Sequence, residues 1–162
     1  MQQPELAGLR TRVLVVDDEQ MALMVIPEAL EEGLEELGWT DLVIDTADSG
    51  EAALATEGEI DLLVTDVVMP GIDGIETFAQ LKERWPDMAC VVMTAQAPEH
   101  STPIRALRLG AADYVSKPIN PEYLVQTCHR QLVVHHLRRQ VTRNKLLLES
   151  IVESVGDGVV AL

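Results

Sequence analysis

The chain has 162 residues, 47% of them hydrophobic and 24% charged, as expected for one globular domain with an appendage. The formal net charge of −15 disfavours nucleic acid as a partner of this chain, because the phosphate backbone would be repelled. Only two cysteines are present, which excludes a disulfide framework and a cysteine zinc site. No signal peptide or bilayer-spanning apolar run occurs, which indicates a cytoplasmic protein without membrane contact.

Five short apolar runs follow one another along the chain. They lie at residues 13–16, 42–44, 62–64, 91–93 and, shortest, 114–115. None shows polar alternation, and this pattern is typical of strands buried on both faces of a parallel sheet.

The first two helices are predicted between these runs. An apolar stripe at spacings of three and four residues forms the first, with Leu23, Ile26, Leu30, Leu34 and Leu37. Gly38 ends this helix, and Pro27 inside it predicts a kink or a restart. Ser49 is expected to cap a second helix over residues 51–57.

Three further helices are expected in the second half of the chain. Asp73-Gly74 opens the third, which runs through Trp85, and the fourth covers about residues 102–109 with Gly110 as its stop. The fifth begins near Pro121. Strands that alternate with helices predict an α/β fold with a doubly wound, five-stranded parallel sheet.

Polar side chains follow the ends of four of these strands. They are Asp17, Asp18, Asp66, Thr94 and Lys117. Ligands of such sheets bind at the carboxyl ends of the strands, so these side chains are the candidate site. Three neighbouring carboxylates need a cation such as Mg²⁺, and a lysine and a hydroxyl suit phosphoryl oxygens. This set therefore favours phosphoryl transfer to a carboxylate.

Four segments of the chain together resemble the receiver domain of response regulators in two-component signalling. They are VLVVDDE at 13–19, LVTDVVMPGIDG at 63–74, VVMTA at 91–95 and GAADYVSKPI at 110–119. The resemblance covers about residues 12–133. It implies a flavodoxin-like strand order of 2-1-3-4-5, and a receiver is not an enzyme apart from Mg²⁺-dependent self-phosphorylation and autodephosphorylation.

The resemblance also implies roles for the residues at the strand ends. Asp66 would accept a phosphoryl group from a histidine kinase or phosphotransfer protein. Asp17 and Asp18 would hold Mg²⁺ together with Asp66 and the backbone carbonyl of Val68. Lys117 would pair with the phosphoryl group.

The same resemblance implies a switch. Thr94 would follow the phosphoryl group inward, and Tyr114 would rotate with it and alter the face formed by the fourth helix, the fifth strand and the fifth helix. The Lys117–Pro118 bond would be cis. The positions that tune phosphoryl lifetime in the family carry Val68 and Gln96 here, so this lifetime stays open.

The residues after the receiver-like region carry a second pattern. Spacings of three and four residues join Val134, Leu137, Val141, Asn144, Leu148, Ile151 and Val155 into an a/d seam. We expect residues 134–150 to continue the fifth helix as a linker that forms a homodimeric coiled coil, and the alternative is a helix folded back on its own domain. Residues 151–162 resemble the start of a PAS domain, and residues 1–11 form a tail.

Two adjacent histidines, His135 and His136, do not resemble a kinase phosphorylation site, because the expected polar residue and Pro-Leu are missing. Their spacing is also not the i, i+4 spacing of a metal pair on one helix face. Two other functions stay open for the chain. One is a phosphorylation-independent pseudo-receiver that serves as a dimerisation module. The other is an aspartyl-phosphate phosphohydrolase, which would need a second acid at Val68.

Overall fold

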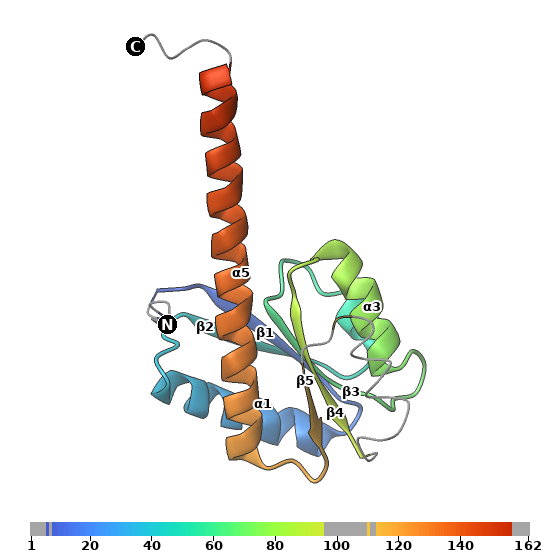
Figure 1. The fold of residues 1–162 in the computed structure, drawn as a ribbon. Coiled ribbons are helices and arrows are strands. Elements are labelled where there is room, and N and C mark those ends of the chain that lie inside the picture. The colour runs from blue at the N-terminus through green and yellow to red at the C-terminus, as the bar shows by residue number, and fades with distance from the viewer. Residues whose placement is uncertain (1–5, 7, 96–109, 111–112, 157–162) are drawn as a thin grey trace.

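A parallel sheet with helices on both faces forms the domain in the computed structural model, which describes residues 6, 8–95, 110 and 113–156 (Figure 1). Five strands pair in the order β2-β1-β3-β4-β5. They are β1 (Thr11–Val16), β2 (Leu42–Ala47), β3 (Leu62–Asp66), β4 (Ala89–Thr94) and β5 (Asp113–Ser116). The predicted doubly wound α/β fold and its strand order are confirmed.

The central strands are buried because both faces of the sheet are covered. Every residue of β3 and β4 is buried, whereas the edge strand β2 is mostly half-buried or exposed. Alternate residues of β1 face opposite sides, as the two-residue repeat of a strand requires. Val13 and Val15 join one apolar cluster, and Leu14 and Val16 join the other.

The two cysteines lie in different clusters. Cys128 packs in the cluster with Val13, and Cys90 packs in the cluster with Leu14, on the opposite face of the sheet. Both thiols are free and fully buried, and burial raises the pKa of each well above its ordinary value. They are therefore inert core residues.

Four helices cover the sheet in the described part of the chain. They are α1 (Gln20–Glu36), α2 (Gly50–Leu54), α3 (Gly74–Arg84) and α5 (Pro121–Gly156). α1 and α5 pack on one face of the sheet and α3 lies on the other (Figure 1). The expected fourth helix over 102–109 lies outside the described residues.

Most predicted helix boundaries are confirmed. α1 runs through Pro27 without a restart, and Gly38 follows it with a φ of 108°. The Ser49 side chain caps α2 by accepting a hydrogen bond from the Ala52 N–H. α2 ends at Leu54, however, and not at residue 57, because the following residues offer no apolar side chain to the core and Gly58 turns the chain with a φ of 88°.

The last helix is continuous over 36 residues, as predicted for the fifth helix and linker. Its first turns pack on the sheet, and the rest projects away from the domain (Figure 1). The alternative of a helix folded back on its own domain is therefore wrong for this structure: Val141 is 66% exposed and Leu148 is 62% exposed. None of the helices in the described part of the chain is long and apolar enough to span a membrane.

Candidate functional site

Three carboxylates meet at the carboxyl ends of β1 and β3. The parallel register places Val16 opposite Thr65, so the next residues, Asp17 and Asp66, follow adjacent strand positions. One oxygen each of Asp17, Asp18 and Asp66 lies within 4.8 Å of the others. Asp17 and Asp66 are buried and Asp18 is exposed, so this predicted acidic trio opens to solvent on one side.

Lys117 brings a positive charge to the same place from the turn after β5. Its Nζ lies 3.1 Å from Asp66 Oδ2 and 3.8 Å from Asp17 Oδ2. Burial disfavours its charged form, but the hydrogen bond to Asp66 and the charges of Asp66 and Asp17 outweigh burial and raise the Lys117 pKa. The Lys117 N–H donates to the Thr94 carbonyl at 2.8 Å, and the predicted cis Lys117–Pro118 bond is present.

One carboxylate oxygen of Asp17 favours a cation at this site. Its Oδ1 accepts from the Glu19 N–H at 2.9 Å, whereas its buried Oδ2 has no hydrogen-bond partner among the described residues. Burial raises the Asp17 pKa, and the nearby Asp66 charge adds to this, although the Glu19 N–H and Lys117 oppose it. A buried carboxylate oxygen without a donor, beside two further carboxylates, fits Mg²⁺, which prefers oxygen ligands.

Replacing Asp17 by asparagine is expected to raise the melting temperature in metal-free buffer at neutral pH. The raised pKa means that the native state favours protonated Asp17, so its ionisation lowers stability as pH rises through and above the ordinary value of 3.8. The same variant should lose most of its response to Mg²⁺. At about 100 times its dissociation constant, Mg²⁺ should add about 2.7 kcal/mol to wild-type unfolding free energy.

Thermal melts with and without MgCl₂ measure both effects. Asp48→Asn is the matched control, because Asp48 is exposed near the same sheet edge and lies outside the acidic trio. Equal Mg²⁺ responses of Asp17→Asn and Asp48→Asn would contradict a site at Asp17.

The turn after β3 holds the Asp66 backbone in place. The Val67 N–H donates to the Met93 carbonyl at 3.1 Å, and the Val67 carbonyl accepts from the Gly74 N–H at 2.8 Å. Gly74 opens α3 directly against the Asp66 carbonyl, so a Cβ there would collide with backbone atoms of Asp66. Glycine is therefore required by space at this position.

We expect Gly74→Ala to destabilise the domain by about 1–3 kcal/mol, the usual cost of overpacking. The new methyl must push the Asp66 carbonyl or the start of α3 aside, and either shift moves the acidic trio. Urea unfolding measures the loss, and Ala79→Ser on the same helix, at a half-buried position, serves as control. An unchanged urea midpoint for Gly74→Ala would contradict this prediction, because it would mean that the turn can shift without loss of stability.

Val68 and Thr94 lie at the same end of the sheet as the acidic trio, whereas Tyr114 lies two residues before the carboxyl end of β5. Val68 follows Asp66 by two positions with a side chain that is 72% exposed. Thr94 ends β4 and is 2% exposed, and Tyr114 lies half-buried in the paired strand β5 against the cluster of Leu14. Gln96 lies outside the described residues.

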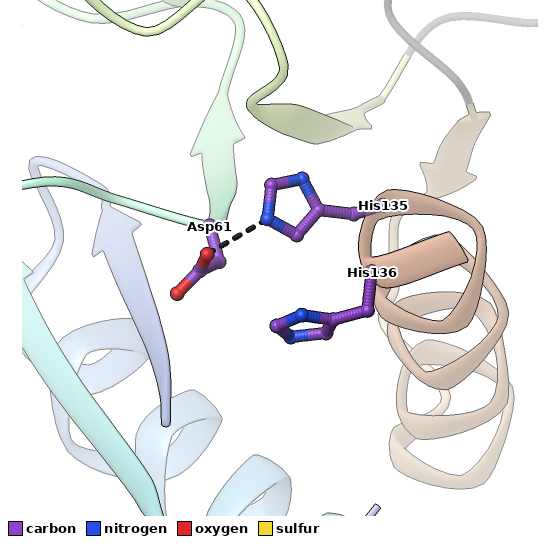
Figure 2. A group of neighbouring side chains, drawn as sticks. All are labelled: Asp61, His135 and His136. Atoms are coloured by element: carbon purple, nitrogen blue, oxygen red, sulfur yellow. Dashed lines mark hydrogen bonds and ion pairs between the residues drawn. The ribbon is translucent and has the colours of Figure 1, made fainter. Parts of the chain in front are cut away.

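A second polar cluster, which the sequence patterns do not predict, lies at the opposite end of β3. Asp61, His135 and His136 offer ligand atoms that all lie within 4.8 Å of one another (Figure 2). Burial disfavours ionised Asp61, but hydrogen bonds from His135 and the Arg12 N–H outweigh it and lower the Asp61 pKa. Burial lowers the pKa of His136 as well, and the nearby His135 charge adds to this. No local pattern could reveal this cluster, because Asp61 and His135 are 74 residues apart.

Comparison with known proteins relates the chain to one family. The family model for the response regulator receiver domain matches residues 13–129. Response regulator SaeR of Staphylococcus aureus is 36% identical over 116 residues, which cover 71% of this chain and 47% of SaeR. The chain thus spans about half the length of the curated relatives it matches.

Two solved structures support the same relation. The BeF3-activated receiver domain of DrrB, a Thermotoga maritima protein, is 31% identical with a TM-score of 0.64, over 76% of this chain and 98% of that chain. TrrA from Thermotoga maritima, solved in complex with Mg²⁺-BeF, is 34% identical with a TM-score of 0.58, over 75% of this chain and 98% of that chain.

Proposed function

The chain belongs to the family of response regulator receiver domains, and on this premise we propose that Asp66 accepts a phosphoryl group from a histidine kinase or phosphotransfer protein. The observation that carries the proposal is the position of the Asp66 carboxylate. It is buried except for an opening to solvent, 3.1 Å from Lys117 Nζ, and it shares its surroundings with Asp17 and Asp18.

In the proposed reaction a phosphoryl group passes from one nucleophile, a histidine nitrogen of the donor, to another, a carboxylate oxygen of Asp66. An Asp66 carboxylate oxygen attacks phosphorus of the donor phosphohistidine, the P–N bond breaks, and the imidazole leaves with the bonding electron pair. Lys117 then pairs with a phosphoryl oxygen, which needs little movement because its ammonium group already contacts Asp66. Asp17, Asp18, Asp66 and the Val68 carbonyl would hold Mg²⁺, which neutralises charge on the phosphoryl oxygens when bound.

The proposed switch runs from this site into β4 and β5. The Thr94 hydroxyl would bind the phosphoryl group, and Tyr114 on the paired strand would then turn inward. Register places Val92 opposite Tyr114 and Thr94 opposite Ser116, so the two switch residues lie on neighbouring strands. A cavity of about 350 Å³ bordered by Tyr114 and Tyr123 lies between β5 and the start of α5, where such a rotation would change the surface.

Mass spectrometry after incubation with acetyl phosphate and MgCl₂ tests the proposal. One phosphoryl group per chain is expected, and none without Mg²⁺. Failure to gain any phosphoryl mass contradicts the proposal. Steady release of more than one phosphate per chain from a phosphorylated metabolite would favour the phosphohydrolase instead.

We further propose that residues 134–150 act as a linker that pairs two copies of the chain and carries the switch toward residues 151–162. The exposed seam members Val141, Leu148, Ile151 and Val155 would be covered by the same residues of the second copy. Asn144 on the seam would set its register. The PAS-like start at 151–162 stays a prediction from sequence.

Replacing Leu148 by lysine is therefore expected to convert the dimer to a monomer, because a charge would enter the seam. Leu146→Lys is the matched control, since Leu146 is 61% exposed against 62% for Leu148 but lies on another side of the helix. Sedimentation velocity measures the oligomeric state. Equal behaviour of the two variants would contradict the seam, and a dimer indifferent to beryllofluoride and to Asp66 substitution would favour the pseudo-receiver.

A further inference from the structure

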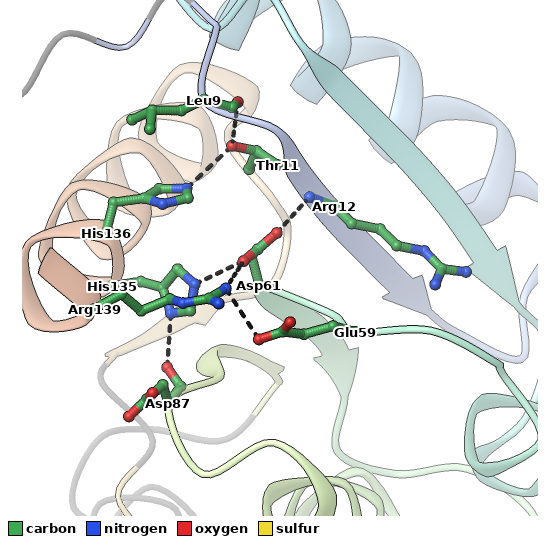
Figure 3. A network of polar contacts seen from close by, with 9 residues as sticks. All are labelled: Leu9, Thr11, Arg12, Glu59, Asp61, Asp87, His135, His136 and Arg139. Atoms are coloured by element: carbon green, nitrogen blue, oxygen red, sulfur yellow. Dashed lines mark hydrogen bonds and ion pairs between the residues drawn. The ribbon is translucent and has the colours of Figure 1, made fainter. Parts of the chain in front are cut away.

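The second cluster, Asp61 with His135 and His136, lies at the amino end of β3, while Asp66 is the last residue at the carboxyl end of the same strand. α5 supplies both histidines, and Asp61 comes from the residue before the strand (Figures 2 and 3). Asp61 is 6% exposed and His135 is 2% exposed. Nothing in the proposed phosphoryl transfer uses these side chains.

Each of the three side chains is oriented by a further hydrogen bond. His135 Nδ1–H donates to the Asp87 carbonyl at 2.7 Å, and Asp61 Oδ2 accepts from the Arg12 N–H at 2.8 Å. The Thr11 hydroxyl donates to the Leu9 carbonyl, so it accepts from His136 Nε2–H at 3.1 Å (Figure 3). This tautomer leaves the lone pair of His136 Nδ1 available.

Such outer partners are typical of histidine and carboxylate metal ligands, whose second nitrogen or oxygen is held by a carbonyl, hydroxyl or amide. The remaining atoms are His135 Nε2, His136 Nδ1 and Asp61 Oδ1. His135 Nε2 lies 2.7 Å from Asp61 Oδ1, which is a hydrogen-bond distance, so an ion that binds both atoms must displace the proton between them and move the two atoms slightly apart.

We propose that Asp61, His135 and His136 form a site for a Zn²⁺-like transition-metal ion. On binding, the ion replaces the proton on His135 Nε2, which leaves to solvent, and bonds form to this nitrogen, to His136 and to Asp61. Two imidazoles and one carboxylate are a common protein ligand set for Zn²⁺, with water in a fourth position. Mg²⁺ prefers oxygen ligands, which distinguishes this site from the acidic trio.

The site has an entry path, which four arginines line: Arg10, Arg12, Arg139 and Arg143. A cavity of about 890 Å³ is bordered by Asp61 and His136, and it leaves room for a water on the ion. Arg139 Nη1 lies 3.5 Å from Asp61 Oδ1 and 3.0 Å from Glu59 Oε1, and its side chain is 34% exposed. The positive charge of Arg139 weakens the binding of a cation, but its partly exposed side chain can turn outward together with Glu59. A bound ion would tie α5 to the residue that precedes β3.

Calorimetric titration of the full chain with ZnCl₂ tests the site. The parent for all variants carries Asp17→Asn, which weakens the acidic trio as a competing zinc ligand set. We expect one Zn²⁺ per chain. Thr11→Val removes an outer partner and should weaken Zn²⁺ binding by about 10–100-fold. His136→Gln removes a ligand and should weaken Zn²⁺ binding by more than this range.

His129→Gln is the matched control and should leave the affinity unchanged. His129 lies on the same helix, but its Nδ1 accepts from the Trp39 indole N–H at 3.0 Å and it has no part in the cluster. Arg139→Gln should tighten binding, which keeps the test decisive if His136→Gln does not fold. Absence of Zn²⁺ binding, equal affinities of the His136→Gln and His129→Gln chains, or unchanged affinity in Arg139→Gln would overturn the proposal. No phosphoryl donor is present, so the result is independent of Asp66 phosphorylation.

Discussion

Replacing Asp66 by asparagine is expected to abolish incorporation of phosphoryl groups from acetyl phosphate. The amide keeps the size of the side chain but lacks the nucleophilic carboxylate oxygen, and no neighbour can replace it in the same position. Asp17 is tied by the Glu19 N–H, and exposed Asp18 lies at the mouth of the site. Intact-mass spectrometry should find one phosphoryl group on wild type and none on the variant.

The matched control is Asp48→Asn, which removes an exposed aspartate near the same sheet edge and should be phosphorylated like wild type. The Asp66→Asn variant also allows a check on Lys117. With the Asp66 charge removed, the ammonium group loses its nearest carboxylate, and its raised pKa should fall toward the ordinary value of 10.5. Undiminished phosphoryl incorporation in Asp66→Asn would place the acceptor elsewhere.

Replacing His135 by leucine is expected to cost about 3 kcal/mol of unfolding free energy in the presence of a chelator. The His135 side chain is 1% exposed and bonds both Asp61 and the Asp87 carbonyl (Figure 3). Leucine leaves the buried Asp61 carboxylate without its main partner, with only the Arg12 N–H and the Arg139 guanidinium at 3.5 Å, and this weakened compensation of its charge is the source of the cost. Urea unfolding measures it.

Two controls separate this explanation from a general loss of packing. Glu59→Gln removes a half-exposed acid that pairs with Arg139, so it should cost less than about 1 kcal/mol. Combining Asp61→Asn with His135→Leu should cost less than the sum of the two single changes, because the double variant holds no buried unpaired charge. Strict additivity would show that Asp61 and His135 do not interact in solution.

Much of the fold follows from local patterns. The apolar runs at 13–16, 62–64 and 91–93 become central strands because only a sheet covered on both faces can bury consecutive apolar residues. Ser49 and Asp73 cap helices as their side chains suggest. The predicted end of α2 at residue 57 is wrong, because the helical pattern at 51–57 does not show that contact with the core stops after Leu54.

The candidate site was predictable for a related reason. Residues that follow parallel strands meet at one edge of the sheet, so Asp17, Asp66 and Lys117 converge although they are distant in sequence. The strand order came from the family resemblance and not from periodicity. The sequence could not predict that Asp17 Oδ2 is buried without a hydrogen-bond partner among the described residues, because burial of a single atom depends on packing from several elements.

Three features could be predicted from the amino-acid sequence alone: the class of fold, the end of the sheet that carries the acidic trio, and the continuation of the last helix. These features depend on local periodicity and on the geometry of parallel strands. Two further features are seen only in the folded chain: Asp61 meets His135 and His136, and the end of α5 extends beyond the domain. Both depend on how α5 packs across the sheet, and side chains on adjacent helix positions can converge on a third residue only when another element brings it within reach.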